Sequence, residues 1–195
     1  ALVDFTLATF GKIDILVLAA GVAAHSTFRN FETMDIPKQI MDVNFMGCVY
    51  MTQHALPALR QSKGQIVVCS SISGEIGIAL RSFYCAAKAA VSNFYRSLRI
   101  EEQDITISLM VLDTFSGSNF RNNSLVKADA LEDRKTATVE QVAEMVIASA
   151  DRKAPVSMIP GKAALIRVFF QMGETVSPTF MTNFMRKKAP PMPKL

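Results

Sequence analysis

The sequence contains no tryptophan, three cysteines and two histidines, and these scarcities limit the chemistry it can hold. Cys48, Cys69 and Cys85 form no C-x-x-C pair, and His25 and His54 lie far apart, so we predict no metal site. The cysteines fall in predicted helices and a strand, where small buried thiols are common. No apolar run reaches the length of about 18 residues that a transmembrane helix needs, so we expect none in this chain.

Charge is also scarce, at 19% of residues, and the net charge is only +4. The basic excess lies largely at the end of the chain, in Arg186, Lys187, Lys188 and Lys194. Basic residues do not alternate with aromatic ones, so we predict no nucleic-acid partner. Half of the residues are hydrophobic, which is typical of a globular protein with a sizeable core.

Apolar, β-branched runs alternate with helical patterns along most of the chain. The runs at 14–18, 65–69, 105–112 and 155–159 are typical of buried parallel strands. Helical patterns are expected at 1–10, 37–60, 82–101 and 138–150. This alternation predicts an α/β fold with a parallel sheet and helices on both faces. We expect one domain portion at 1–162, followed by an apolar extension with a basic tail at 163–195.

Tyr84 and Lys88 lie four residues apart in the predicted helix 82–101, so both side chains share one face. A neighbouring ammonium favours phenolate, which predicts a lowered pKa for Tyr84. Ser71 follows the strand at 65–69, where its hydroxyl could complete an acid/base group for a carbonyl or carbinol oxygen. The alternative is that Tyr84 is an ordinary helix aromatic and Lys88 a solvated charge.

Two further positions are candidates for the same site. Asn44 is a polar residue within an apolar helical stripe, and a buried asparagine needs hydrogen-bond partners. Ala19, Ala20 and Gly21 follow the strand at 14–18, and small residues there let a ligand approach the backbone. The core face of helix 82–101 is expected to contain Phe83, Ala86, Ala87, Ala90, Val91, Phe94 and Leu98.

Together, Ser71, Tyr84, Lys88 and Asn44 resemble the motifs of the short-chain dehydrogenase/reductase family. The resemblance implies a Rossmann-like doubly wound parallel sheet. It also implies that Tyr84 donates or accepts the proton, that Ser71 polarises the substrate oxygen, and that Lys88 lowers the tyrosine pKa and touches the nicotinamide ribose. Asn44 would anchor a water that leads to Lys88.

Within that family, the segments 43–45, 55–57, 61–68 and 107–112 are similar to the 11-beta-hydroxysteroid dehydrogenase-like branch. The resemblance implies NADP or NAD as cofactor, with NADP favoured, and a lipophilic steroid- or retinoid-like alcohol or carbonyl as substrate. It further implies a homodimer through helices 37–60 and 82–101. The full-length protein would be microsomal or bound to the endoplasmic reticulum membrane, with a cytoplasmic location as the alternative.

The chain departs from the family pattern at its cofactor-binding half. The glycine-rich phosphate loop and the first strands are absent, so we interpret the chain as the C-terminal part of something longer. The family's proline and glycine after the strand at 105–112 are replaced here by Leu112 and Asp113, and a buried aspartate beside nicotinamide would be unfavourable. The cofactor-binding residues implied by the resemblance are Ala19, Ala20, Gly21, Asn44, Tyr84, Lys88, Asp113 and Thr114.

A second hypothesis follows from these departures: a truncated or inactive relative that binds no cofactor and acts through its dimer or lipid-facing surface. Residues 113–137 form a long polar connection, which the resemblance implies is the substrate loop. Residues 163–186 are rich in phenylalanine and methionine. They would cover the core, contact a dimer partner or line a greasy pocket, or they would form a surface that dips into a membrane.

Overall fold

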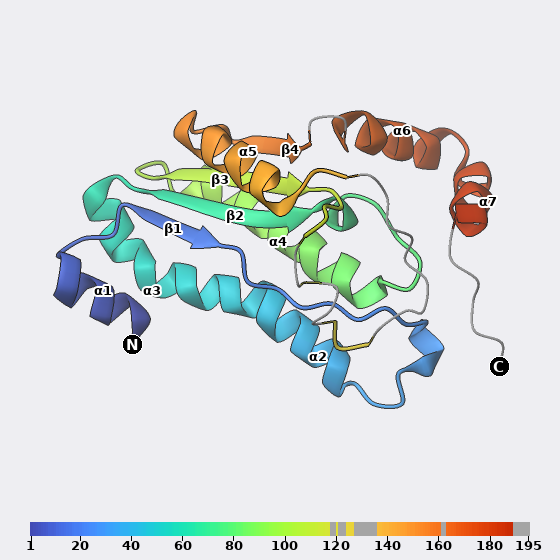
Figure 1. Ribbon diagram of the computed structural model, residues 1–195, viewed down its shortest axis with the longest axis horizontal. Helices are drawn as coiled ribbons and strands as arrows, with labels where there is room; N and C mark the ends of the chain where they lie inside the picture. The colour runs from blue at the N-terminus through green and yellow to red at the C-terminus, as the bar shows by residue number, and fades with distance from the viewer. Residues whose placement is uncertain (118–119, 121–123, 127–135, 161–162, 189–195) are drawn as a thin grey trace.

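The computed structural model describes residues 1–117, 120, 124–126, 136–160 and 163–188. Four parallel strands form one sheet in the order β1-β2-β3-β4 (Figure 1). They are β1 (Ile15–Leu18), β2 (Gln65–Ser71), β3 (Thr106–Leu112) and β4 (Val156–Ile159). The predicted α/β class with a parallel sheet is confirmed.

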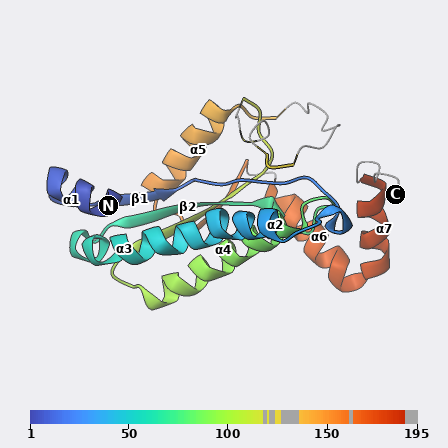
Figure 2. The same ribbon diagram turned by 90° about the horizontal axis from the view of Figure 1, so that it is seen from below.

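Helices cover both faces of this sheet (Figures 1 and 2). One face carries α3 (Gly47–Ser62) and α4 (Ser82–Glu101), and the other carries α5 (Val139–Asp151). A short α2 (Asp35–Met41) runs through a π turn, η2 (Asp42–Met46), into α3. The remaining elements are α1 (Leu2–Phe10), the 3-10 turns η1 (Phe28–Asn30) and η3 (Ile72–Gly74), α6 (Ala163–Val176) and α7 (Pro178–Lys188).

The central strands are apolar without alternation because both of their faces are buried. Ile66 and Val68 pack in the core beneath α3 and α4, whereas Val67 packs in the core beneath α5. Ile107 and Met110 divide between the two cores in the same way on β3. A strand with side chains of period two needs hydrophobic residues at every position when helices cover both sides.

The buried side of α4 contains most of the predicted core residues, since Ala87 and Val91 are fully buried and Phe83, Phe94 and Leu98 pack against the cores, but it extends further than predicted. Tyr84, Lys88, Ser92 and Tyr95 are buried, whereas Ala86 is exposed. Polar partners make this possible: the Tyr95 hydroxyl lies 2.6 Å from the Thr52 hydroxyl, and the Ser92 hydroxyl lies 2.8 Å from that of Ser70. Buried polar groups that are hydrogen-bonded fit a core that an apolar pattern alone would assign elsewhere.

β1 lies at one edge of the sheet. Its Leu16 and Leu18 face the core beneath α3, but Ile15 and Val17 on the opposite side are 53% and 58% exposed. β1 is therefore an edge strand with one exposed apolar face.

The C-terminal helices α6 and α7 lie beyond the carboxyl ends of the strands (Figures 1 and 2). They pack on each other where Gly173 leaves room for Met181. Many of their apolar side chains are exposed, namely Leu165, Val168, Phe169, Met172, Val176 and Phe180. Among the residues described, no helix combines the length and the apolar character that crossing a membrane requires. Most of the predicted substrate loop and the end of the basic tail, including Lys194, lie outside the described residues.

Candidate active site

The predicted site residues lie at the carboxyl edge of the sheet, where parallel strands expose their ends to ligands. The register pairs Leu18 with Val68 and Ser71 with Leu112, so the segments that follow β1, β2 and β3 emerge at the same edge. Helix α4 brings Tyr84 and Lys88 to this edge from the side.

Ser71 ends β2 and starts the η3 turn. Its hydroxyl caps that turn by accepting a hydrogen bond from the Ser73 N–H at 3.2 Å. A capped turn fixes the backbone of Ser71, because the side chain satisfies a donor that would otherwise have no partner. The hydroxyl also interacts with Tyr84 and lowers the pKa of that phenol.

Tyr84 and Lys88 are both buried, with 8% and 5% of their surfaces exposed. The Lys88 ammonium donates to the Cys69 carbonyl at 2.9 Å and lies 5.9 Å from the centroid of the Tyr84 ring. Burial raises the pKa of Tyr84 to about 12, against the lowering effects of Ser71 and Arg81. Burial likewise lowers the pKa of Lys88. The predicted lowering of the Tyr84 pKa was therefore wrong for the described structure, because burial of the phenol outweighs nearby positive charge.

Asn44 is fully buried in the π turn η2 and holds the segment after β1. Its carboxamide accepts from the Val22 N–H and donates to the Val22 carbonyl, both at 2.8 Å. The structural hydrogen bond expected for Asn44 is confirmed, whereas the water leading to Lys88 remains a prediction. π turns are rare and often occur at functional sites.

Gly21 joins Asn44 and Lys88 at one point. A Cβ atom placed on Gly21 would lie 2.9 Å from the Asn44 Oδ1 and 3.8 Å from the Lys88 Nζ. Only glycine lets the backbone come this close to the clamped amide. Ala19 and Ala20, also predicted as cofactor contacts, are exposed at the same edge.

Phe120 is a site residue that sequence reasoning missed. Its ring centroid lies 5.7 Å from that of Tyr84, and its Cε2 would be 3.7 Å from a Cβ on Gly21. The ring therefore lies against Tyr84, beside the Gly21 backbone. An aromatic residue within a polar connection was the available signal, but its contacts depend on how the loop folds back.

Asp113 and Thr114 follow β3 and bind mainly to their own neighbourhood. The Asp113 N–H donates to the Ile159 carbonyl at 2.8 Å, and the Asp113 carboxylate accepts from the Thr114 N–H at 2.7 Å. These contacts place them at the same sheet edge, one and two residues beyond the level of Ser71. Their predicted contact with a cofactor stays a prediction.

The η3 turn packs directly on the turn of α4 that carries Lys88, and this contact permits a test. A Cβ on Gly74 would lie 2.6 Å from the Lys88 carbonyl oxygen, which is backbone and cannot swing away. We expect Gly74→Ala to lower the free energy of unfolding by about 1–3 kcal/mol, as is typical of overpacked sites. Gly77→Ala is the matched control, since nothing lies within 4 Å of its Cβ position. Equal denaturation midpoints for the two variants would contradict this packing.

The raised pKa of Tyr84 predicts how stability depends on pH. The phenol has an ordinary pKa of 10.0, and it is raised to about 12 in the fold, so the folded chain holds this proton where the unfolded chain has lost it. The resulting stability is complete below pH 10 and is lost as the pH rises through 12, by about 3 kcal/mol in total. Urea titrations at pH 8 and above should show a shallower decline for Tyr84→Phe than for the unsubstituted chain. Identical pH slopes would count against the buried, protonated phenol.

The fold and this edge define a parallel α/β protein with a half-buried serine and a buried tyrosine and lysine at the ligand-binding end of its sheet. A family model described as short chain dehydrogenase matches residues 1–121, more than half of the chain. The chain belongs to the short chain dehydrogenase family, as its motifs predicted.

Relatives carry names from the predicted branch. The chain is 43% identical over 110 residues to 11-beta-hydroxysteroid dehydrogenase-like 3 of Arabidopsis thaliana, which covers 56% of this chain and 36% of that protein. It is 45% identical over 109 residues to 11-beta-hydroxysteroid dehydrogenase A of Sesamum indicum, which covers 55% of this chain and 31% of that protein. The chain thus spans about a third of the length of these two relatives.

Solved structures confirm the fold. A short chain dehydrogenase from Burkholderia cenocepacia in complex with NADP superposes with a TM-score of 0.75 at 17% identity, covering 94% of this chain and 73% of that one. An alcohol dehydrogenase from Thermococcus sibiricus complexed with 5-hydroxy-NADP gives a TM-score of 0.69 at 19% identity, covering 80% and 66%.

Proposed function

We propose that this chain carries the acid/base half of an NAD(P)-dependent oxidoreductase that interconverts a lipophilic alcohol and its carbonyl. One observation carries the proposal: Tyr84, Lys88 and Ser71 meet beside the Gly21 backbone at the carboxyl edge of the sheet. Membership of the short chain dehydrogenase family supports it, and the names of the relatives favour a steroid-like substrate.

The geometry suggests a role for each side chain. In the direction of reduction, Tyr84 holds its proton at neutral pH and gives it to the substrate oxygen, since its pKa lies near 12. The Ser71 hydroxyl donates a second hydrogen bond to that oxygen. The Lys88 ammonium, fixed by the Cys69 carbonyl, stabilises the phenolate that remains. A bound nicotinamide cofactor would supply the hydride to the carbonyl carbon.

The residues fit one end of such a cofactor. Lys88 and the Gly21 backbone lie together at the edge, as the nicotinamide ribose requires, and of the similar structures one is a complex with NADP and another a complex with 5-hydroxy-NADP. The sequence contains no G-x-x-x-G-x-G loop to hold a pyrophosphate at a helix N-terminus. The ligands of the similar structures make NADP the favoured cofactor. Because the loop is absent from this sequence, the affinity of these 195 residues for NADP is the quantity to measure.

Titration of the chain against NADPH, followed by the fluorescence of the dinucleotide itself, tests the proposal. We expect saturable binding that Lys88→Met removes, because this variant loses the buried ammonium. Lys38→Met, on the exposed side of α2, is the control and should bind as the unsubstituted chain does. No saturation by any of the three proteins would favour a relative without cofactor binding.

The second candidate function applies if the chain binds no cofactor: it would act through its surfaces, by binding a membrane or a second copy of itself. Leu165 and Val176 on α6 and Phe180 on α7 are exposed apolar side chains, and α7 ends in the basic sequence Arg186-Lys187-Lys188. Such a combination suits the surface of an anionic membrane, which supports a microsomal location over a cytoplasmic one. A homodimer through helices 37–60 and 82–101 is a further part of this proposal, supported by the exposed Tyr50 on α3. Flotation with anionic vesicles and sedimentation in their absence test the two surfaces separately.

A further inference from the structure

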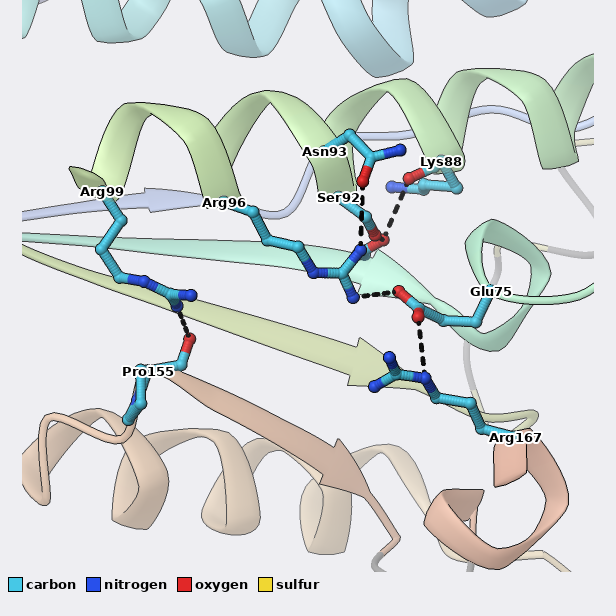
Figure 3. Close-up of polar contacts among 9 residues, drawn as sticks. Glu75, Lys88, Ser92, Asn93, Arg96, Arg99, Pro155 and Arg167 are labelled. Atoms are coloured by element: carbon cyan, nitrogen blue, oxygen red, sulfur yellow. Dashed lines mark hydrogen bonds and ion pairs between the residues drawn. The ribbon is translucent and has the colours of Figure 1, made fainter. Parts of the chain in front are cut away.

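Glu75 is a nearly buried carboxylate that the acid/base chemistry does not use. Its side chain is only 2% exposed, and it contacts two guanidinium groups (Figure 3). The Arg96 Nη2 donates to one carboxylate oxygen at 2.7 Å. The Arg167 Nε lies 3.1 Å from the other oxygen, close enough for an ion pair but not aligned as a hydrogen bond. A buried charge is retained only with such partners.

The two arginines belong to different parts of the fold. Arg96 lies on α4, about two turns beyond Lys88, whereas Arg167 lies near the start of α6. Glu75 itself lies in the connection between Ser71 and Tyr84. One carboxylate therefore ties the C-terminal helices to the helix and the loop that carry the acid/base group.

The loop around Glu75 transmits its position directly to that group. The Glu75 and Ile76 N–H groups both donate to the Ile72 carbonyl, at 2.9 and 3.0 Å, which closes the turn that starts at Ser71. The same turn touches the Lys88 backbone at Gly74, and the Ser70 hydroxyl donates to the Lys88 carbonyl at 3.3 Å. A displacement of Glu75 would therefore move both Ser71 and the Lys88 turn.

We propose that Glu75 is a positioning residue that couples the docking of α6, through Arg167, to the geometry of Ser71 and Lys88. The two cations share one carboxylate, so loss of Arg167 leaves Glu75 with Arg96 alone and frees the loop on the side that faces α6. The structural coupling stands by itself. Its effect on turnover rests on the proposed function.

Hydrogen exchange of the chain tests the coupling without any activity measurement. In Arg167→Met, we expect the amides of Glu75 and Ile76 to exchange about tenfold faster, as a local opening of the turn becomes easier. Arg99→Met is the matched control. Arg99 extends from α4, as Arg96 does, but it donates to the Pro155 carbonyl at 2.6 Å instead of contacting Glu75 (Figure 3). It should leave those two amides unchanged, and Arg167→Lys, which keeps the charge, should restore most of the protection.

A double-mutant cycle identifies the carboxylate as the link. In a Glu75→Gln background, Arg167→Met should produce no further increase in exchange at Ile76, because the contact is already lost. An equal increase in both backgrounds would overturn the proposal, as would faster exchange confined to α6. If Arg167→Met fails to fold, Glu75→Gln takes its place and Arg167→Lys stays as the control: Ile76 should exchange faster in Glu75→Gln and not in Arg167→Lys, and full protection of Ile76 in Glu75→Gln would overturn the proposal.

If the protein reduces a carbonyl substrate with NADPH, its turnover provides a second measurement. We expect Arg167→Met to lower kcat about tenfold with an unchanged KM for NADPH, since a positioning effect alters the reacting geometry rather than binding. A change confined to KM would contradict a positioning role. A protein with no turnover at all would count against the proposed function, while the exchange result would still decide the coupling.

Discussion

Replacing Tyr84 with phenylalanine should lower the rate of carbonyl reduction by about 100- to 10,000-fold, the usual contribution of a positioned proton donor. The phenyl ring fills the same volume and keeps its contact with Phe120, so the loss reflects the missing hydroxyl. Burial holds the Tyr84 pKa at about 12, so at neutral pH the unsubstituted chain carries the proton that the variant lacks. Steady-state oxidation of NADPH with a lipophilic ketone measures the effect.

Tyr95→Phe is the matched control for this variant. Tyr95 is also a buried tyrosine of α4, but its hydroxyl contacts the Thr52 hydroxyl and donates to the Cys48 carbonyl at 3.0 Å, away from the sheet edge. It should cost about 1–3 kcal/mol of stability because it leaves buried partners unpaired, with turnover of the folded protein unchanged. Normal turnover by Tyr84→Phe would refute the role of the phenol.

Replacing Asn44 with alanine should lower the free energy of unfolding by about 2–4 kcal/mol. The change removes both hydrogen bonds to Val22 and leaves a backbone N–H and a carbonyl without their partner. It also frees the Gly21 backbone beside Lys88, so we expect weaker NADPH binding in the same variant. Thermal unfolding and NADPH titration measure the two effects.

Asn93→Ala provides the comparison. Asn93 is exposed on α4, and its side-chain oxygen accepts a long hydrogen bond of 3.5 Å from Arg96. Its loss should change stability by less than about 0.5 kcal/mol, as is usual for surface positions. Similar melting temperatures for the two asparagine variants would show that the clamp on Val22 contributes little.

The sequence was most informative where one physical rule acts alone. Strands buried on both faces must be continuously apolar, so the runs ending near Leu18 and Leu112 located the sheet. The spacing of Tyr84 and Lys88 placed both on one helical face, because residues four apart lie one turn apart on a helix. The buried side of α4 was harder to predict from the sequence. Ser92 and Tyr95 are buried because they form hydrogen bonds with residues of β2 and α3 that are distant in sequence.

Electrostatics at the site could not be read from spacing. Placing an ammonium four residues from a phenol predicts attraction, but it does not give the degree of burial, which sets the direction of the Tyr84 pKa. The same limit applies to Phe120 and Glu75. Their contacts with Tyr84 and Arg167 join segments whose approach depends on the whole fold.

The Asn44 clamp has a consequence for the sheet itself. A carboxamide carries the same carbonyl and N–H groups as a peptide bond, and Asn44 directs its Oδ1 and one N–H of its NH2 group at Val22, as a neighbouring strand would. The π turn η2 thus supplies the backbone of Val22 with the pair of hydrogen bonds that a neighbouring strand would give it, four residues after β1 ends at Leu18. An aspartate of the same shape would present two acceptors and face the Val22 carbonyl with like polarity. Position 44 therefore requires a carboxamide of this length, because the side chain has to accept from the Val22 N–H and donate to the Val22 carbonyl at the same time.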